Sequence, residues 1–130
     1  MSMKIADSEL EVMRILWREG RPLSFMEIRT ELESKTNWSK STIQTLLVRL
    51  RDKGIINAEF HHVTLYSPNV TEQEYILAEE KTFLDKLFSG NAKNFVASLC
   101  RSGQLDESDV DELKQFFMMN EEEENDKRSI

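Results

Sequence analysis

Apolar residues recur every three or four positions over most of the chain, a spacing typical of amphipathic α-helices. Helix starts are marked by Ser or Thr with Glu three residues later, or by a polar capping residue directly before an apolar run. The pattern predicts helices that begin at Ser8, Ser24, Ser39, Thr71, Asn91 and Asp106. The first is expected to end at Gly20, the third at Lys53, and the last three near Phe88, Cys100 and Met119.

The spacing changes from helical to alternating after Gly54. Residues 55–69, IINAEFHHVTLYSPN, predict two short strands that join near His61-His62 and stop at Pro68. A β-hairpin directly behind three helices is the arrangement of a winged helix-turn-helix. We therefore expect a mainly α fold with a small β-hairpin wing, in which a winged helix-turn-helix at residues 1–69 precedes a C-terminal helical dimerisation domain.

Composition and charge narrow the class of protein. Of the 130 residues, 39% are apolar and 32% charged, and no apolar run reaches the roughly eighteen residues of a membrane span. We expect a cytoplasmic protein without membrane insertion or a secretion signal. The net charge of −7 is unevenly spread: residues 1–69 hold 10 Lys and Arg against 9 Asp and Glu (+1), and residues 70–130 hold 7 against 15 (−8). The first domain therefore has no excess negative charge that would prevent it from binding a polyanion.

The predicted third helix has an outer face suited to reading DNA. At about 100° per residue its buried stripe consists of Ile43, Leu46, Leu47 and Leu50. Short hydroxyl and amide side chains lie opposite and can reach base edges, and an apolar one can touch a thymine methyl. An ordinary solvated helix face remains the alternative, although the order of elements favours nucleic-acid binding. The outer face and its flanks hold Ser41, Gln44, Thr45, Val48, Lys40, Thr42 and Arg49.

Other chemistry finds little support in the sequence. The single cysteine, Cys100, excludes an intrachain disulfide and a cysteine-cluster metal site, and its apolar helix predicts a small buried residue. His61 and His62 are adjacent in a strand or turn, so their side chains diverge. No phosphate-binding glycine loop, nucleophile elbow or zinc-protease motif occurs. We expect no enzyme activity, no metal and no cofactor.

Three segments, SELEVMRILWREG, WSKSTIQTLLVRLRDKG and LYSPNVTEQEY, resemble one known family. It is the penicillinase-repressor family of bacterial winged-helix regulators, and the resemblance extends from residue 5 to about residue 117. Its most specific part is the pattern W-S-x-x-T-I-x-T-x-x-x-R-L-x-x-K-G, from Trp38 to Gly54. The resemblance implies a dimeric repressor that binds a palindromic double-stranded DNA operator of a resistance gene.

The resemblance also assigns roles to residues of the third helix. It implies that Arg49 and Lys53 bind phosphates. At the wing this chain departs from the family, because His61-His62 stands where Gly, Lys or Arg is usual. Contact of these two histidines with DNA is therefore left open. The residues that the resemblance turns toward the bases, on a reading helix from Ser39 to Lys53, are Lys40, Ser41, Thr42, Gln44 and Thr45.

The second half, residues 70–119, has apolar helix faces and too little bulk to bury them alone. A twofold dimer would cover these faces and supply two reading helices for an inverted repeat; packing on the winged domain is the alternative. Residues 120–130 form an acidic run without an apolar partner, which predicts a disordered tail. The residues expected at the dimer interface are Ile76, Phe83, Leu84, Leu87, Phe95, Val96, Leu99, Leu113 and Phe117.

The resemblance further implies that repression ends when a membrane sensor protease cuts the dimer-forming helices. In the family the cut falls at an Asn-Phe pair, which aligns with Ser98-Leu99 here, while Asn94-Phe95 occurs one helical turn earlier. Release by a ligand or another protein is the alternative. For the chain as a whole, the alternative function is a winged-helix module that binds a protein and has no specific DNA site.

Overall fold

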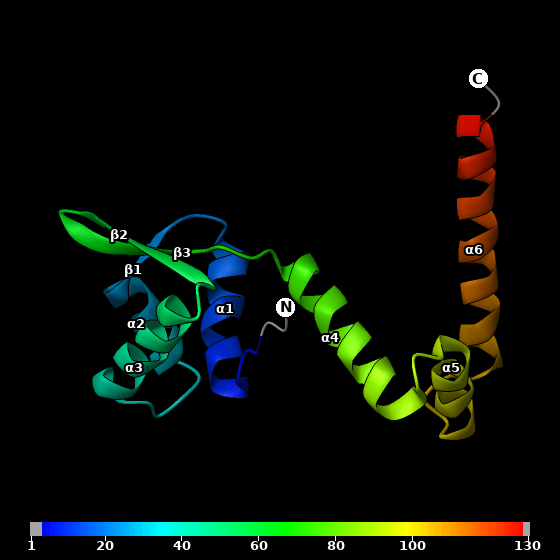
Figure 1. The fold of residues 1–130 in the computed structure, drawn as a ribbon, viewed down its shortest axis with the longest axis horizontal. Coiled ribbons are helices and arrows are strands. Elements are labelled where there is room, and N and C mark those ends of the chain that lie inside the picture. Colours follow the sequence, from blue (N-terminus) through cyan, green and yellow to red (C-terminus); the bar gives the residue numbers. More distant parts are fainter. Residues whose placement is uncertain (1–3, 129–130) are drawn as a thin grey trace. The chain divides into compact units, whose positions relative to one another are not determined.

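The computed structural model describes residues 4–128, with the side chains of residues 4–119, and divides into two compact units, Met1–Glu80 and Lys81–Ile130 (Figure 1). It confirms a mainly helical fold with a small antiparallel sheet. The elements are α1 (Asp7–Glu19), β1 (Leu23–Ser24), α2 (Phe25–Glu33), α3 (Lys40–Asp52), β2 (Ile56–His61), β3 (Val63–Pro68), α4 (Glu72–Phe88), α5 (Ala92–Arg101) and α6 (Glu107–Arg128).

The core of the N-terminal unit lies where α1, α2 and α3 meet the sheet. It is built from aliphatic side chains that the helical spacing places on inward faces, and Trp38 packs against its edge at the entry to α3. The predicted hairpin β2–β3 forms, and the short link before α2 adds a third strand, with Leu23 opposite Tyr66. The strand order is β1-β3-β2. This sheet therefore ties the hairpin to the start of α2.

Three of the four helix starts predicted in this unit are confirmed and one is wrong; Thr71, before α4, accepts the Glu74 N–H at 3.0 Å. Ser24 and Glu27 form a reciprocal capping box, and Ser39 accepts the backbone N–H of Thr42 at 3.2 Å. The first helix does not begin at Ser8. Its cap is Ala6, two residues earlier, and the helix starts at Asp7, because the Glu9 carboxylate accepts the backbone N–H of Ala6 at 2.9 Å.

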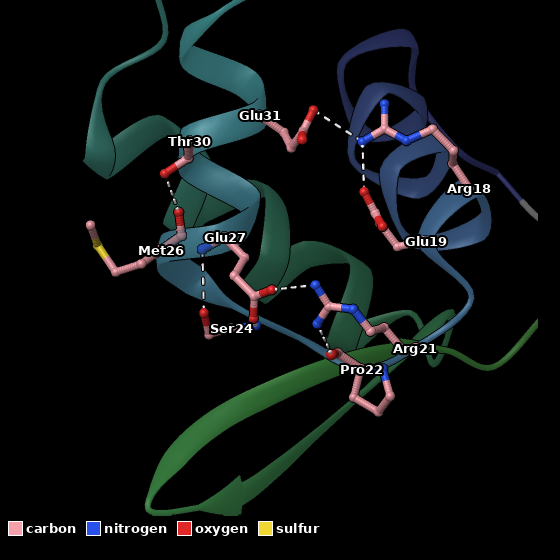
Figure 2. Close-up of polar contacts among 9 residues, drawn as sticks. All are labelled: Arg18, Glu19, Arg21, Pro22, Ser24, Met26, Glu27, Thr30 and Glu31. Atoms are coloured by element: carbon pink, nitrogen blue, oxygen red, sulfur yellow. Dashed lines mark hydrogen bonds and ion pairs between the residues drawn. The ribbon is translucent and has the colours of Figure 1, made fainter.

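A polar network joins the end of α1 to α2 (Figure 2). Arg18 donates to both Glu19 and Glu31 at 3.0 Å, and Arg21 donates to Glu27 at 2.6 Å. The Arg21 guanidinium, followed by the backbone N–H of Ser24, lowers the pKa of the Glu27 carboxyl. Since the folded-state pKa is lowered, any stability from this contact is present at neutral pH and is lost as the pH falls through that pKa. The network is exposed, so it orients α2 more than it stabilises the fold.

The boundary between the two units lies inside α4, later than the predicted boundary after residue 69. Trp17 of α1 donates its indole N–H to the Val70 carbonyl at 2.9 Å, and its ring lies 5.7 Å from that of Tyr75. Partial burial raises the pKa of the Tyr75 phenol. The first turn of α4 is therefore part of the N-terminal unit, which a boundary drawn at residue 69 divides.

The C-terminal unit contains the end of α4 with α5 and α6; α4 and α5 lie close to their predicted bounds, and α6 starts where predicted. Asn91 caps α5 by accepting the Asn94 N–H at 3.1 Å. Three aromatic rings cluster between α4 and α5, with centroids 5.2 to 5.9 Å apart, from Phe83, Phe88 and Phe95. No helix among residues 4–128 is long and apolar enough to cross a membrane.

Two predictions for this unit are wrong. The tail expected to be disordered continues α6 as far as Arg128. Glu, Lys and Arg are good helix formers, and extending an existing helix avoids the cost of nucleation. Cys100, expected to be buried, is exposed. The unit offers it no closed interior, because every described residue from Lys81 to Met119 is partly or fully exposed.

Candidate nucleic-acid interface

Helix α3 presents the two faces that the sequence predicted. Its apolar stripe is buried in the core, and the residues on the other side are exposed from Ser39 to Val48. Burial on one side fixes the rotation of the helix about its axis. The same four polar or small side chains that were expected to face outward, Ser41, Gln44, Thr45 and Val48, are therefore held at the surface.

The hydroxyl groups on this face are partly occupied by the helix itself. Thr45 donates to the Ser41 carbonyl at 3.0 Å, and the hydroxyls of Ser39 and Thr42 lie 3.1 Å apart. Ser39 thus has the capping role that the sequence predicted, and its hydroxyl is shared with Thr42. Gln44 has no side-chain partner among residues 4–119. Its amide, with a donor and an acceptor, is the group most available to a base edge.

On α3 and its C-cap, two basic side chains form no ion pair within the described residues and two do; one of the paired ones is Arg51, which lies 3.7 Å from Asp52. Lys40 and Arg49 are exposed and form no ion pair within the described side chains. Lys53 is different, because its ammonium lies 2.6 Å from Glu9 Oε1 and donates to the Lys4 carbonyl at 2.9 Å. The Lys53 ammonium is thus engaged within the unit, whereas the resemblance implied that it binds phosphate.

Glu9, the partner of Lys53, is a buried carboxylate that the sequence analysis did not single out. It is 2% exposed, and its Oε1 accepts hydrogen bonds from both Lys53 and the Ala6 N–H. Its Oε2 is buried without a partner in the described part of the chain. The ion pair therefore joins the end of α3 to the start of α1 and keeps a buried charge compensated.

A shallow hollow of about 620 Å³ joins α3 to the wing. Gln44 and Lys40 line it from α3, and Thr64 and Tyr66 line it from β3. The start of α2 closes its third side with Ser24, Phe25 and Met26. The polar face of α3 is thus continuous with one face of the hairpin, so a single bound molecule can contact both.

The tip of the wing has no Lys or Arg and exposes two apolar side chains beside its histidines. His62 lies between the strands with φ of 63°, and His61 contacts the Glu59 carboxylate at 3.1 Å. Phe60 is 76% exposed and Val63 is 54% exposed. Sequence reasoning noticed the two histidines and missed these apolar neighbours, although an aromatic residue next to a hairpin turn was a visible signal. No group of three or more potential metal ligands occurs among residues 4–128.

The residues predicted for the dimer interface lie on α4, α5 and α6, and none is buried in the single chain. Exposed apolar residues of α6 that were not predicted, Phe116, Met118 and Met119, add to them. Asn94-Phe95 falls in the first turn of α5 and Ser98-Leu99 one turn later, toward its end. Both candidate bonds are thus in helical backbone. The exposed members of the predicted set are Ile76, Phe83, Leu87, Val96, Leu113 and Phe117, and the half-buried ones are Leu84, Phe95 and Leu99.

Comparison with known proteins places these features in context. The family model described as penicillinase repressor matches residues 5–118. The penicillinase repressor of Bacillus licheniformis is 35% identical and the match covers 88% of this chain and 89% of that protein. The penicillinase repressor of Staphylococcus aureus is 32% identical, with 88% and 91% covered.

Two solved structures are similar to the N-terminal part of the chain. The DNA binding domain of the repressor BlaI is 39% identical with a TM-score of 0.50, over 58% of this chain and 94% of that one. Bacillus licheniformis BlaI, as a monomeric form in complex with the blaP half-operator, is 38% identical with a TM-score of 0.51, over 58% and 92%.

Proposed function

The chain belongs to the penicillinase repressor family, and on that premise we propose that it is a sequence-specific DNA-binding repressor of transcription. One observation carries the proposal: α3 holds Gln44, Lys40 and Arg49 exposed and without partners among the described side chains. The solved relative in complex with a half-operator supports DNA as the partner. The protein acts in the cytoplasm, at operators of resistance or stress genes.

The exposed face of α3 divides into base-reading and phosphate-binding residues. Gln44 offers the donor and acceptor pair that adenine presents in the major groove, and Val48 suits a thymine methyl. Lys40, Ser41, Thr42 and Thr45 lie toward the same groove, the two threonines with hydroxyls already shared with the helix. Arg49 binds phosphate, while Lys53 holds α3 in place through Glu9.

Gln44→Ala and Arg49→Ala should weaken DNA binding in different ways. We expect Gln44→Ala to cost on the order of 1–3 kcal/mol on the operator and little on random DNA, since it removes a base contact. Arg49→Ala should weaken both and reduce the slope of log K against log salt by about one unit, since it removes a phosphate contact. Fluorescence anisotropy at several salt concentrations measures both effects. Equal losses on the two DNAs for Gln44→Ala would show that Gln44 does not read bases.

The protein binds its operator as a homodimer through the C-terminal unit. The support is that α4, α5 and α6 expose most of the predicted apolar set and that residues 81–119 bury none of their own side chains. Exposed apolar faces of this extent mark interaction sites. Self-association covers them and supplies two copies of α3, as an inverted repeat requires.

Repression ends by proteolysis within α5, at Ser98-Leu99 or at Asn94-Phe95. Proteases act on extended backbone, so either cut requires α5 to open locally first. The Asn94-Phe95 bond lies next to the Asn91 cap, where helix ends open most easily. A cut at either bond separates α6 from α4 and removes part of the interface.

Mass spectrometry of the protein from induced cells tests this cleavage. We expect fragments that end at Ser98 or at Asn94, together with loss of operator binding, because two half-sites are no longer bound as one unit. A membrane sensor protease is the proposed partner. Intact protein that leaves its operator on induction would refute cleavage and favour release by a ligand or another protein.

A further inference from the structure

The tip of the wing exposes an aromatic side chain that the fold does not use. Phe60 is 76% exposed and makes no ring contact with any described aromatic residue. The hairpin extends beyond the helices of its own unit, and Phe60 lies near the end of β2 (Figure 1). Exposing a large apolar side chain to water costs free energy, so a surface that covers it on binding gains affinity.

The register of the hairpin shows which way this side chain faces. Phe60 is paired with Thr64, and successive residues of a strand point to opposite faces. Phe60 therefore shares a face with Thr64 and Tyr66, which line the hollow beside Lys40 and Gln44 of α3. A molecule that lies along the outer face of α3 and in this hollow therefore meets the face of the hairpin that carries Phe60.

The charge of the wing determines what kind of contact it can make. No Lys or Arg occurs between Lys53 and Lys81, so the hairpin carries no permanent positive charge for a phosphate. The carboxylate of the hairpin, Glu59, lies on the face of β2 opposite to Phe60. An aromatic side chain can still pack on the apolar edges of deoxyribose rings that form the walls of the minor groove, where apolar side chains are a common means of contact.

We propose that Phe60 is a DNA contact of the wing, packing on deoxyribose in the minor groove that flanks the half-site read by α3. This inference rests on the proposed function and adds a contact that is apolar and independent of salt. The wing thereby contributes affinity while the positive charge stays on α3.

Phe60→Ala should lower affinity for the operator about tenfold, as expected for losing a partly buried aromatic contact. The slope of log K against log salt should stay unchanged, because no phosphate contact is removed. Phe60→Leu should keep most of the affinity. The matched control is Asn57→Ala, an exposed neutral residue on the opposite face of β2, which should bind within twofold of the wild type. Thermal unfolding of all three variants should match the wild type, because both positions are exposed.

Hydroxyl-radical footprinting gives a direct readout, since the radical attacks deoxyribose from the minor groove. Wild-type protein should protect sugars flanking each half-site, and Phe60→Ala should lose that protection while guanine N7 under α3 stays protected from methylation. Wild-type affinity and footprint in Phe60→Ala would overturn the proposal, and altered sedimentation of the same variant without DNA would assign Phe60 to a protein contact instead. If the proposed function is wrong, the wild-type protein itself would not prefer its selected DNA over random DNA, and this result is distinct from a loss in Phe60→Ala alone.

Discussion

Replacing Leu87 with aspartate is expected to convert the protein to a monomer and to weaken binding to a palindromic operator by about 100-fold or more. Leu87 is 59% exposed on α4, so the charge should not disturb the fold of the single chain. In a dimer the same position is desolvated, and two unpaired carboxylates would be buried across the twofold axis. Each winged unit would then bind its half-site alone.

Sedimentation equilibrium measures the association state of Leu87→Asp, and anisotropy measures its affinity for the palindrome and for an isolated half-site. The matched control is Gln115→Asp, which makes the same charge change at an exposed polar position of α6. The control should remain dimeric with wild-type affinity. A dimeric Leu87→Asp at micromolar concentration, or a monomer that still binds the palindrome tightly, would contradict dimerisation through this surface.

Replacing Lys53 with methionine is expected to destabilise the N-terminal unit by about 2–3 kcal/mol while leaving the salt slope of DNA binding unchanged. Breaking a buried ion pair costs roughly 3–5 kcal/mol, and we reduce this because the Lys53 side chain is 38% exposed and its pairing is partly screened. The cost arises because the buried Glu9 carboxylate loses its countercharge. Urea unfolding followed by circular dichroism measures the change.

A double-mutant cycle isolates the pair. Glu9→Met combined with Lys53→Met should recover part of the stability lost in Lys53→Met, because it removes the uncompensated charge. If the two losses simply add, the 2.6 Å contact contributes no coupling. A salt slope reduced by about one unit in Lys53→Met would show that Lys53 contacts phosphate after all.

The helices could be predicted from the sequence because their signals are local. Capping residues such as Ser24 and Ser39 act within three residues, and the apolar spacing repeats within each helix. Strand β1 could not be predicted, since two residues carry no period and Leu23 becomes a strand only by pairing with Tyr66. The domain boundary was placed too early for the same reason, because the Trp17–Tyr75 contact joins distant parts of the sequence.

In the candidate site, too, the local features could be predicted from the sequence and the long-range contacts could not. The outer face of α3 was predictable because the buried stripe fixes the rotation of the helix. The ion pair of Lys53 could not be predicted, since its partner Glu9 lies 44 residues away in the sequence. The exposure of Phe60 depends on where the hairpin extends past the core, which alternation along a strand does not specify.

Selection of bound fragments from the source genome tests the central claim most directly. Wild-type protein should enrich fragments that share an inverted repeat, with half-sites about one helical turn or a multiple of it apart, and raising the salt concentration should weaken binding steeply. Gln44→Ala should lose the enrichment while still retaining DNA nonspecifically. Recovery of fragments with no common sequence, or binding insensitive to salt, would contradict operator recognition and leave a winged-helix module that binds a protein.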